Sequence, residues 1–208
     1  MSSISLSSLV PWCLGDFLCG SIPFGLLLVK VAGKGDVREH GSGNIGATNV
    51  SRVGGKALGI LTLLLDILKG FLPVFLAKQL GWGEPALSLL ALSAVLGHVF
   101  TPWLKFRGGK GVATALGTAL AFRAAMVLPA LGVFIVLLLV FRYVSLGSVM
   151  AAAALPVLLA WKGAPPAVLL LWAGISLTVV LKHHENIRRL LKGTESPLWG
   201  TKKEAARV

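Results

Sequence analysis

Charged residues are scarce in this chain, and acidic residues are the scarcest. Of the 208 residues only 13% are charged, and 8 Asp and Glu residues stand against 20 Lys and Arg residues. Soluble domains carry about 25% charged residues, so this composition argues against a soluble protein. The apolar share is 55% and the mean hydropathy is +0.83. These values are typical of a protein that crosses a membrane several times.

Long polar stretches and cysteines are also lacking. The longest polar stretch, residues 33–56, is only a loop, so we expect a single integral-membrane domain over residues 1–208. The two cysteines, Cys13 and Cys19, lie on different faces of one predicted helix, which argues against a disulfide or a metal site there. No other cluster of metal ligands is present, and we expect neither a metal nor another cofactor. Because no Lys or Arg precedes Lys30, the first apolar segment lacks the basic start of a signal peptide and is expected to be a retained transmembrane helix.

Apolar segments of about 20 residues, the length that a helix needs to cross the hydrocarbon core, recur along the chain. The sequence therefore predicts an all-α, polytopic membrane helix bundle. The expected transmembrane helices are residues 8–30, 57–80, 86–104, 111–122, 124–141, 144–161 and 165–182. The fourth is short, because about 12 residues at about 1.5 Å each reach only about 18 Å, and could be a tilted or partial helix.

Positive charge predicts the orientation of these helices. If the N-terminus lies outside and the chain crosses seven times, every Lys and Arg except Lys69, Lys78, Arg123 and Lys162 faces the cytoplasm. Merging the fourth and fifth helices into one crossing would instead put the basic segment after the last helix outside. Seven transmembrane helices with a cytoplasmic C-terminus are therefore preferred. Since the basic residues flank apolar spans and form no single patch, membrane topology explains the net charge of +12 better than nucleic-acid binding does.

Three short polar segments interrupt the apolar chain, and with seven crossings all three face the cytoplasm. The first segment, residues 41–52, combines glycines and amides with a closing arginine. Glycines let successive backbone N–H groups converge on an anion, and hydroxyl, amide and guanidinium groups can add hydrogen bonds to a phosphate. The alternative is a flexible loop that needs glycine only to turn between helices. The candidate residues are Gly41, Ser42, Gly43, Asn44, Gly46, Asn49 and Arg52.

The second segment, residues 105–114, runs into a predicted helix. Its candidate phosphate-binding residues are Gly108, Gly109, Lys110 and Gly111. Helix N-termini bind anions through free N–H groups, and the lysine adds a full positive charge. The pattern is not a Walker A loop, which needs glycine where Leu104 stands and Ser or Thr after the lysine, so ATP hydrolysis is disfavoured. The alternative is a basic stop signal at a helix end.

The third segment, residues 183–195, follows the last span and predicts an amphipathic helix along the membrane surface. His183, Asn186 and Arg189 fall on one face of that helix. The alternative is a basic surface helix without chemistry, which we favour for Arg188 and for Lys192.

Charged residues inside the predicted spans form a separate group. Asp66 and Lys69 are three residues apart in one helix and can pair on one face. Because such charges are costly in lipid, we expect them to face the bundle interior, as an ion pair that orients helices in preference to a proton relay. His98 could line the same cavity, and a packed, hydrogen-bonded histidine is the alternative.

Several motifs together resemble one family over the whole chain. They are GSGNIGATN at 41–49 with Arg52, LDILKG at 65–70, GH at 97–98, FRGGKGVAT at 106–114, and HHENIRRLL at 183–191 followed by Glu195. On these motifs the chain resembles the bacterial acyl-phosphate:glycerol-3-phosphate acyltransferases of the inner membrane. Thr101 departs from the family's frequent proline at this position, and Pro102 follows it.

The resemblance implies transfer of a fatty acyl group from acyl phosphate to the 1-hydroxyl of glycerol 3-phosphate, giving lysophosphatidic acid and inorganic phosphate. By motif position it makes Ser42 and Arg52 an essential pair and assigns phosphate binding to the glycine–lysine loop. It adds His183 and Asn186 to the polar site and gives Glu195 a structural role. It also implies a multi-pass protein of the bacterial inner membrane that could contact the soluble enzyme that makes acyl phosphate.

The residues leave the general base open. The H-x4-D signature of other acyltransferases is absent. His183 could take the hydroxyl proton, or an oxygen of a substrate phosphate could take it, which we favour because His183 lies among basic residues.

Two other kinds of protein compete with the enzyme. A transporter for a phosphorylated anion could also use glycine loops, although its site would lie at mid-membrane between internal repeats, and no repeat is evident. A scaffold could use basic loops to hold anionic lipid. The enzyme requires that the three polar segments meet at one cytoplasmic pocket.

Overall fold

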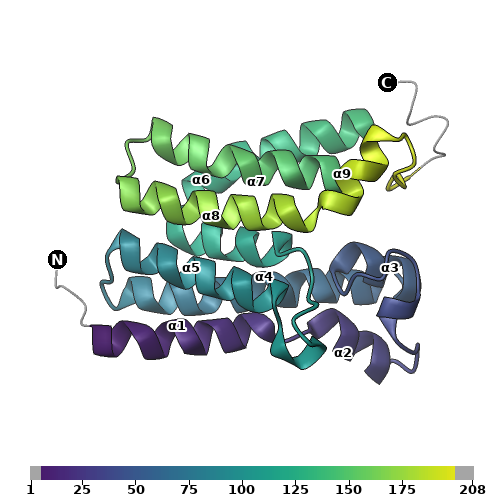
Figure 1. Cartoon of the computed structure of the whole chain (residues 1–208), viewed down its shortest axis with the longest axis horizontal. Helices are drawn as coiled ribbons and strands as arrows, with labels where there is room; N and C mark the ends of the chain where they lie inside the picture. The colour runs from purple at the N-terminus through teal and green to yellow at the C-terminus, as the bar shows by residue number, and fades with distance from the viewer. Residues whose placement is uncertain (1–5, 200–208) are drawn as a thin grey trace. The chain divides into compact units, whose positions relative to one another are not determined.

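The computed structural model describes residues 6–199, and all regular secondary structure in this range is helical (Figure 1). Lys202, Lys203 and Arg207, predicted to face the cytoplasm, lie outside the described residues. The chain divides into two compact units, Met1–Phe122 (unit 1) and Arg123–Val208 (unit 2).

Unit 1 contains most of the helices. They are α1 (Leu6–Ser21), α2 (Phe24–Val31), η1 (Val37–Glu39), α3 (Ala47–Gly54), α4 (Lys56–Gln79), α5 (Glu84–Val99), η2 (Pro102–Leu104) and the first part of α6 (Val112–Phe141). The first predicted span, residues 8–30, is broken between α1 and α2. Pro23 has no N–H to donate and restricts the residue before it, so the helix ends there and restarts at Phe24.

Glycines bring the long helices of unit 1 into close contact. A Cβ added to Gly20 of α1 would meet the carbonyl of Ala94 on α5, and one added to Gly97 of α5 would meet the carbonyl of Phe17. Large apolar side chains such as Leu14 and Leu18 point outward from α1 and are at least half exposed. A soluble protein rarely exposes such a surface, and lipid covers it at no cost.

Unit 2 contains the rest of α6, α7 (Val144–Trp161), α8 (Pro166–Lys182) and α9 (His184–Leu191). Helix α6 joins the predicted spans 111–122 and 124–141, and its backbone leaves helical geometry at Arg123, with φ −148° and ψ 85°. The interruption predicted between those spans is therefore present. By length and composition the described helices give 5 candidate spans, or up to 6 if α8 and α9, bent by 57°, count as one. The number of crossings, predicted as seven, stays a prediction.

Candidate active site

The first polar segment folds as a turn of residues 40–46 followed by helix α3, so Arg52 lies on a helix and not in a flexible loop. The backbone turns at Gly41 (φ 62°) and Gly43 (φ 68°), in the left-handed region that side chains other than glycine rarely adopt. The Asn44 Oδ1 accepts a hydrogen bond from Gly46 N at 2.7 Å, which fixes the entry into α3.

Asn49 holds this turn together from inside. Its Nδ2 donates to the carbonyls of Val37, His40 and Asn44 at 3.0, 3.1 and 2.9 Å, and its Oδ1 accepts from Ser42 N at 2.9 Å. The side chain is buried. These bonds make Asn49 a residue that shapes the loop, and the direct phosphate contact predicted for it stays a prediction.

Ser42 and Arg52 are left available by this arrangement. Both are exposed. Within residues 6–199 neither the Ser42 hydroxyl nor the Arg52 guanidinium has a hydrogen-bond or ion-pair partner. An unpaired hydroxyl on a braced loop and an unpaired guanidinium on the helix that follows it are the groups that a phosphate ligand would engage.

The second polar segment is pinned to the end of α5. Gly108 N donates to the Val99 carbonyl and Gly109 N donates to the His98 carbonyl, both at 3.1 Å. A Cβ at Gly108 would meet the His98 carbonyl, and one at Gly109 would meet the His98 ring, so both positions require glycine. Helix α6 then begins at Val112. Its first N–H groups have no intrahelical acceptor, as at every helix N-terminus, and phosphate binding by this loop stays a prediction.

One buried cluster of unit 1 lies against the first segment and next to the start of the second. The cluster contains Leu26 and Val29 of α2, Val37 of η1, Ile45 and Val50 of the first segment, and Leu104 of η2. Leu104 directly precedes the second segment, so the cluster anchors the first segment and the start of the second. Figure 1 shows α2 and α3 at the same end of the unit. A common phosphate site formed by these two segments stays a prediction.

The third segment begins at the bend between α8 and α9 in unit 2 and contains α9 and the turn after it. His183 is buried, and its Nδ1 lies 2.7 Å from the Val179 carbonyl. Because a carbonyl only accepts, that Nδ1 carries a proton, and in a neutral ring the lone pair is then on Nε2. His183 therefore has the tautomer of a histidine that can accept a proton through Nε2.

Glu195 organises the chain after α9. Its Oε1 accepts from Asn186 Nδ2 at 2.6 Å and from Ser145 Oγ at 2.8 Å, and its Oε2 pairs with Arg189 Nε at 2.6 Å. Burial works to raise the pKa of Glu195, but the hydrogen bonds from Asn186, Arg189 and Ser145 together lower it below its ordinary value. A carboxylate held in this way fixes the Asn186 side chain. Sequence reasoning missed Ser145, a serine at the start of an apolar helix and 50 residues from its partner.

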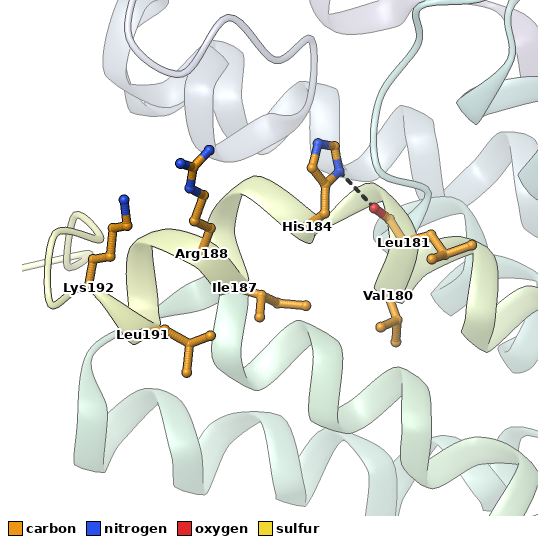
Figure 2. A pocket seen from close by; sticks show the side chains of 7 residues that line it. All are labelled: Val180, Leu181, His184, Ile187, Arg188, Leu191 and Lys192. Carbon is orange, nitrogen blue, oxygen red and sulfur yellow. Dashed lines mark hydrogen bonds between the residues drawn. The ribbon is translucent and has the colours of Figure 1, made fainter.

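An open hollow of about 400 Å³ lies along α8 and α9 (Figure 2). Its lining residues are Val180, Leu181, His184, Ile187, Arg188, Leu191 and Lys192. In Figure 2 the side chains of Arg188 and Lys192 point to one side of α9, and those of Ile187 and Leu191 point to the other. This separation is the amphipathic pattern predicted for the segment.

The Asp66–Lys69 ion pair predicted from spacing is present. Lys69 Nζ lies 2.7 Å from Asp66 Oδ1, and both side chains are 3% exposed. Within residues 6–199 no group of three or more His, Cys, Asp or Glu side chains could hold a metal ion.

Comparison with known proteins identifies the family. The family model described as glycerol-3-phosphate acyltransferase matches residues 10–193. A glycerol-3-phosphate acyltransferase of Trichlorobacter lovleyi is 54% identical over 185 residues, which are 89% of this chain and 95% of the relative. One of Geobacter sulfurreducens is 50% identical over 180 residues, which are 86% and 92% of the two chains.

Two solved structures share the fold. They are crystal structures of PlsY (YgiH), an integral membrane glycerol 3-phosphate acyltransferase. The glycerol 3-phosphate form has a TM-score of 0.89 and 40% identity, covering 95% of this chain and 98% of that one. The lysophosphatidic acid form has a TM-score of 0.85 and 38% identity, covering 97% and 100%. This chain therefore belongs to the glycerol-3-phosphate acyltransferase family of integral membrane proteins.

Proposed function

We propose that this protein transfers a fatty acyl group from acyl phosphate to the 1-hydroxyl of glycerol 3-phosphate. The observation that carries the proposal is the pair Ser42 and Arg52, exposed and without partners among residues 6–199. Ser42 lies on the first loop and Arg52 on the helix that follows it, and this segment packs on the same buried cluster as Leu104, the residue before the glycine–lysine segment. Relatives that bear the name glycerol-3-phosphate acyltransferase and a solved relative with glycerol 3-phosphate support the acceptor. The donor is our inference from the motifs and from the number of phosphate-binding elements.

The reaction is a substitution at a carbonyl carbon. The 1-hydroxyl oxygen of glycerol 3-phosphate attacks the acyl carbon, and the bond from that carbon to the phosphate oxygen breaks. The bond's electron pair leaves with inorganic phosphate, and the hydroxyl proton passes to a base. The ester product is lysophosphatidic acid, which is the molecule named in the second solved relative.

Positioning and charge stabilisation can supply most of this catalysis, because acyl phosphate already carries a good leaving group. We assign Arg52 and Ser42 to one phosphate, as charge and hydrogen-bond donor. The loop of Gly108 to Gly111 with Lys110 holds the other through backbone N–H groups and the lysine charge. Asn186, fixed by Glu195, and His183 complete the predicted polar site.

The proton acceptor is either His183 or an oxygen of a substrate phosphate. The Nδ1 contact with the Val179 carbonyl is compatible with the first, because in a neutral ring it puts the lone pair on Nε2. Replacement His183→Gln separates them. Near-normal kcat would exclude His183 as the base, whereas a collapse of kcat with an unchanged KM would support it.

We propose a topology of seven crossings, with the N-terminus outside and the C-terminus and both loops in the cytoplasm of a bacterial inner membrane. The distribution of Lys and Arg supports it. We also propose that residues 1–208 work as one acyltransferase domain and that this domain contacts the soluble enzyme that makes acyl phosphate.

An assay of the purified protein in detergent tests the activity and the donor. We expect product from glycerol 3-phosphate with acyl phosphate and little with acyl-CoA or acyl carrier protein. Product from another donor only would overturn the donor assignment. Uptake of a phosphorylated anion into liposomes without any product would favour the transporter.

Alanine at Ser42 or Arg52 tests the site. Loss of transition-state contacts predicts roughly a hundredfold or greater fall in kcat/KM for either variant. Lys56→Ala is the matched control, because Lys56 is an exposed cation four residues after Arg52 at the start of α4. Equal effects at Arg52 and Lys56 would indicate general attraction of anions, as in a scaffold.

A further inference from the structure

A buried polar cluster lies inside unit 1. Lys69 Nζ contacts Asp66 Oδ1 at 2.7 Å and His98 Nδ1 at 2.9 Å, and it donates to the carbonyl of Ile22 at 2.8 Å. The three residues are buried, with relative exposures of 2% for Asp66, 4% for Lys69 and 4% for His98 as whole residues. Lys69 therefore ties α4 to α5 and to the break between α1 and α2.

Burying charged side chains in a membrane protein costs free energy, so a buried cluster of this kind suggests a functional role. The cluster lies directly beside the candidate phosphate loop of residues 108–110. The third member, His98, makes two contacts with Gly109. Its backbone carbonyl accepts a hydrogen bond from Gly109 N, and its ring occupies the space that a Cβ of Gly109 would need. The cluster therefore contacts the candidate phosphate loop through His98, at Gly109.

Lys69 also fixes the ring of His98. An ammonium can only donate, so the contact with Lys69 makes Nδ1 the acceptor and leaves the ring proton on Nε2, toward Gly109. Helix α4, which carries Lys69, also contacts the start of α6, just after the loop. A Cβ at Gly70 would meet the carbonyl of Thr114 near the start of α6, so α4 packs directly against that turn.

We propose that Asp66, Lys69 and His98 are positioning residues that set the shape of the loop from Gly108 to Lys110 for a phosphate monoester. This rests on the proposed function, and the ligand is the phosphate of either glycerol 3-phosphate or acyl phosphate. None of the three side chains needs to touch substrate, since their effect passes through the backbone at Gly108 and Gly109.

The first test removes the cluster without leaving a lone buried charge. The double variant Asp66→Asn with Lys69→Met, and separately His98→Asn, are compared with the unchanged protein in detergent. If the loop moves by about 1 Å, we expect KM for one of the two substrates to rise about tenfold to a hundredfold, with a smaller change in kcat. Measuring both KM values identifies whose phosphate the loop holds.

The second readout does not depend on activity. The amides of Gly108 and Gly109 donate to the carbonyls of Val99 and His98, so loosening the loop should speed their hydrogen exchange. The control is Lys78→Met. Lys78 lies in the last turn of α4, nine residues after Lys69. Its Nζ donates to the carbonyls of Ala121 and Phe122 at 3.0 and 2.8 Å and, within the described part of the chain, makes no hydrogen bond with the loop of residues 108–110. It should change neither the KM values nor the exchange at residues 108–110.

A rescue experiment isolates the contact between ring and loop. Gly109→Ala should impair activity because its methyl group meets the His98 ring. Asparagine at position 98 lacks the far ring atoms, so His98→Asn combined with Gly109→Ala should recover at least about tenfold in kcat/KM over Gly109→Ala alone.

Unchanged KM values and unchanged exchange in the cluster variants would overturn the proposal, as would equal effects from Lys78→Met. If the double cluster variant fails to fold, His98→Asn and the rescue pair still decide, and absence of rescue counts against the proposal. If the unchanged protein makes no product, the proposed function fails, whereas the exchange experiment still judges the positioning role.

Discussion

The buried amide of Asn49 makes hydrogen bonds with four backbone groups of the first loop. Replacement Asn49→Ala removes all four and leaves groups that must find water. We expect a loss of about 1–3 kcal/mol of folding free energy and a larger loss of activity, because Ser42 is carried by this loop. Thermal unfolding in detergent and kcat/KM measure the two effects.

Asn44→Ala is the matched control for that variant. Asn44 lies in the same loop, is only partly buried, and its side chain accepts one bond, from Gly46 N. It should cost clearly less stability than Asn49→Ala. Equal losses at the two positions would contradict the central role of Asn49.

The carboxylate of Glu195 gives the protein a predictable response to acid. Its pKa is lowered in the folded protein, so its contribution to stability is complete above the ordinary value of 4.5 and is lost as the pH falls through the folded-state pKa. Glu195→Gln should therefore lower Tm at pH 7, by about 2–4 °C per kcal/mol lost. The Tm difference from the unchanged protein should shrink toward pH 3. A difference that stays constant from pH 7 to pH 3 would contradict this assignment.

Helices α4 and α6 approach each other through glycine. A Cβ at Gly117 of α6 would meet the backbone carbonyl of Ile67 on α4, and a backbone atom cannot rotate away. Gly117→Ala should therefore push the helices apart and cost about 1–3 kcal/mol. Gly132, also in α6, has nothing within 4 Å of an added Cβ, so Gly132→Ala should be neutral or stabilising. Thermal unfolding of the two variants checks the difference.

The sequence predicted the long elements well because their ends carry strong signals. Residues 144–161 match α7 in full, and 57–80 and 165–182 match α4 and α8 to within one residue at each end. The apolar runs stop there at glycine, proline or basic residues, which leave little choice of boundary. The helix α3 was missed because its eight residues carry few apolar groups, and Val50 is buried only by tertiary contacts.

The candidate site was predictable in its exposed groups and not in its supports. Ser42 and Arg52 lie in a polar segment that differs clearly in composition from the apolar segments around it. The bracing role of Asn49, the ring of His98 against Gly109 and the bond from Ser145 to Glu195 join residues that are distant along the chain or chemically unremarkable. No periodicity or local spacing encodes such contacts, so they need the folded structure.

The number of crossings can be decided by two exposed lysines of unit 2. If the two parts of α6 cross separately, Lys162, in the turn after α7, lies outside and Lys192, after α9, lies in the cytoplasm. If α6 crosses once, both positions exchange sides. Positive charge favours the first arrangement, because it keeps Arg188 and Arg189 of α9 and the flanking Lys182 and Lys192 inside.

Single cysteines at these positions, placed in a chain with Cys13→Ala and Cys19→Ala, report the side directly. A maleimide that cannot cross the membrane should label Lys162→Cys in intact cells and should label Lys192→Cys only after the membrane is opened. Labelling in the reverse order would mean six crossings, would put α9 with His183 and Asn186 outside, and would remove these two residues from any cytoplasmic reaction.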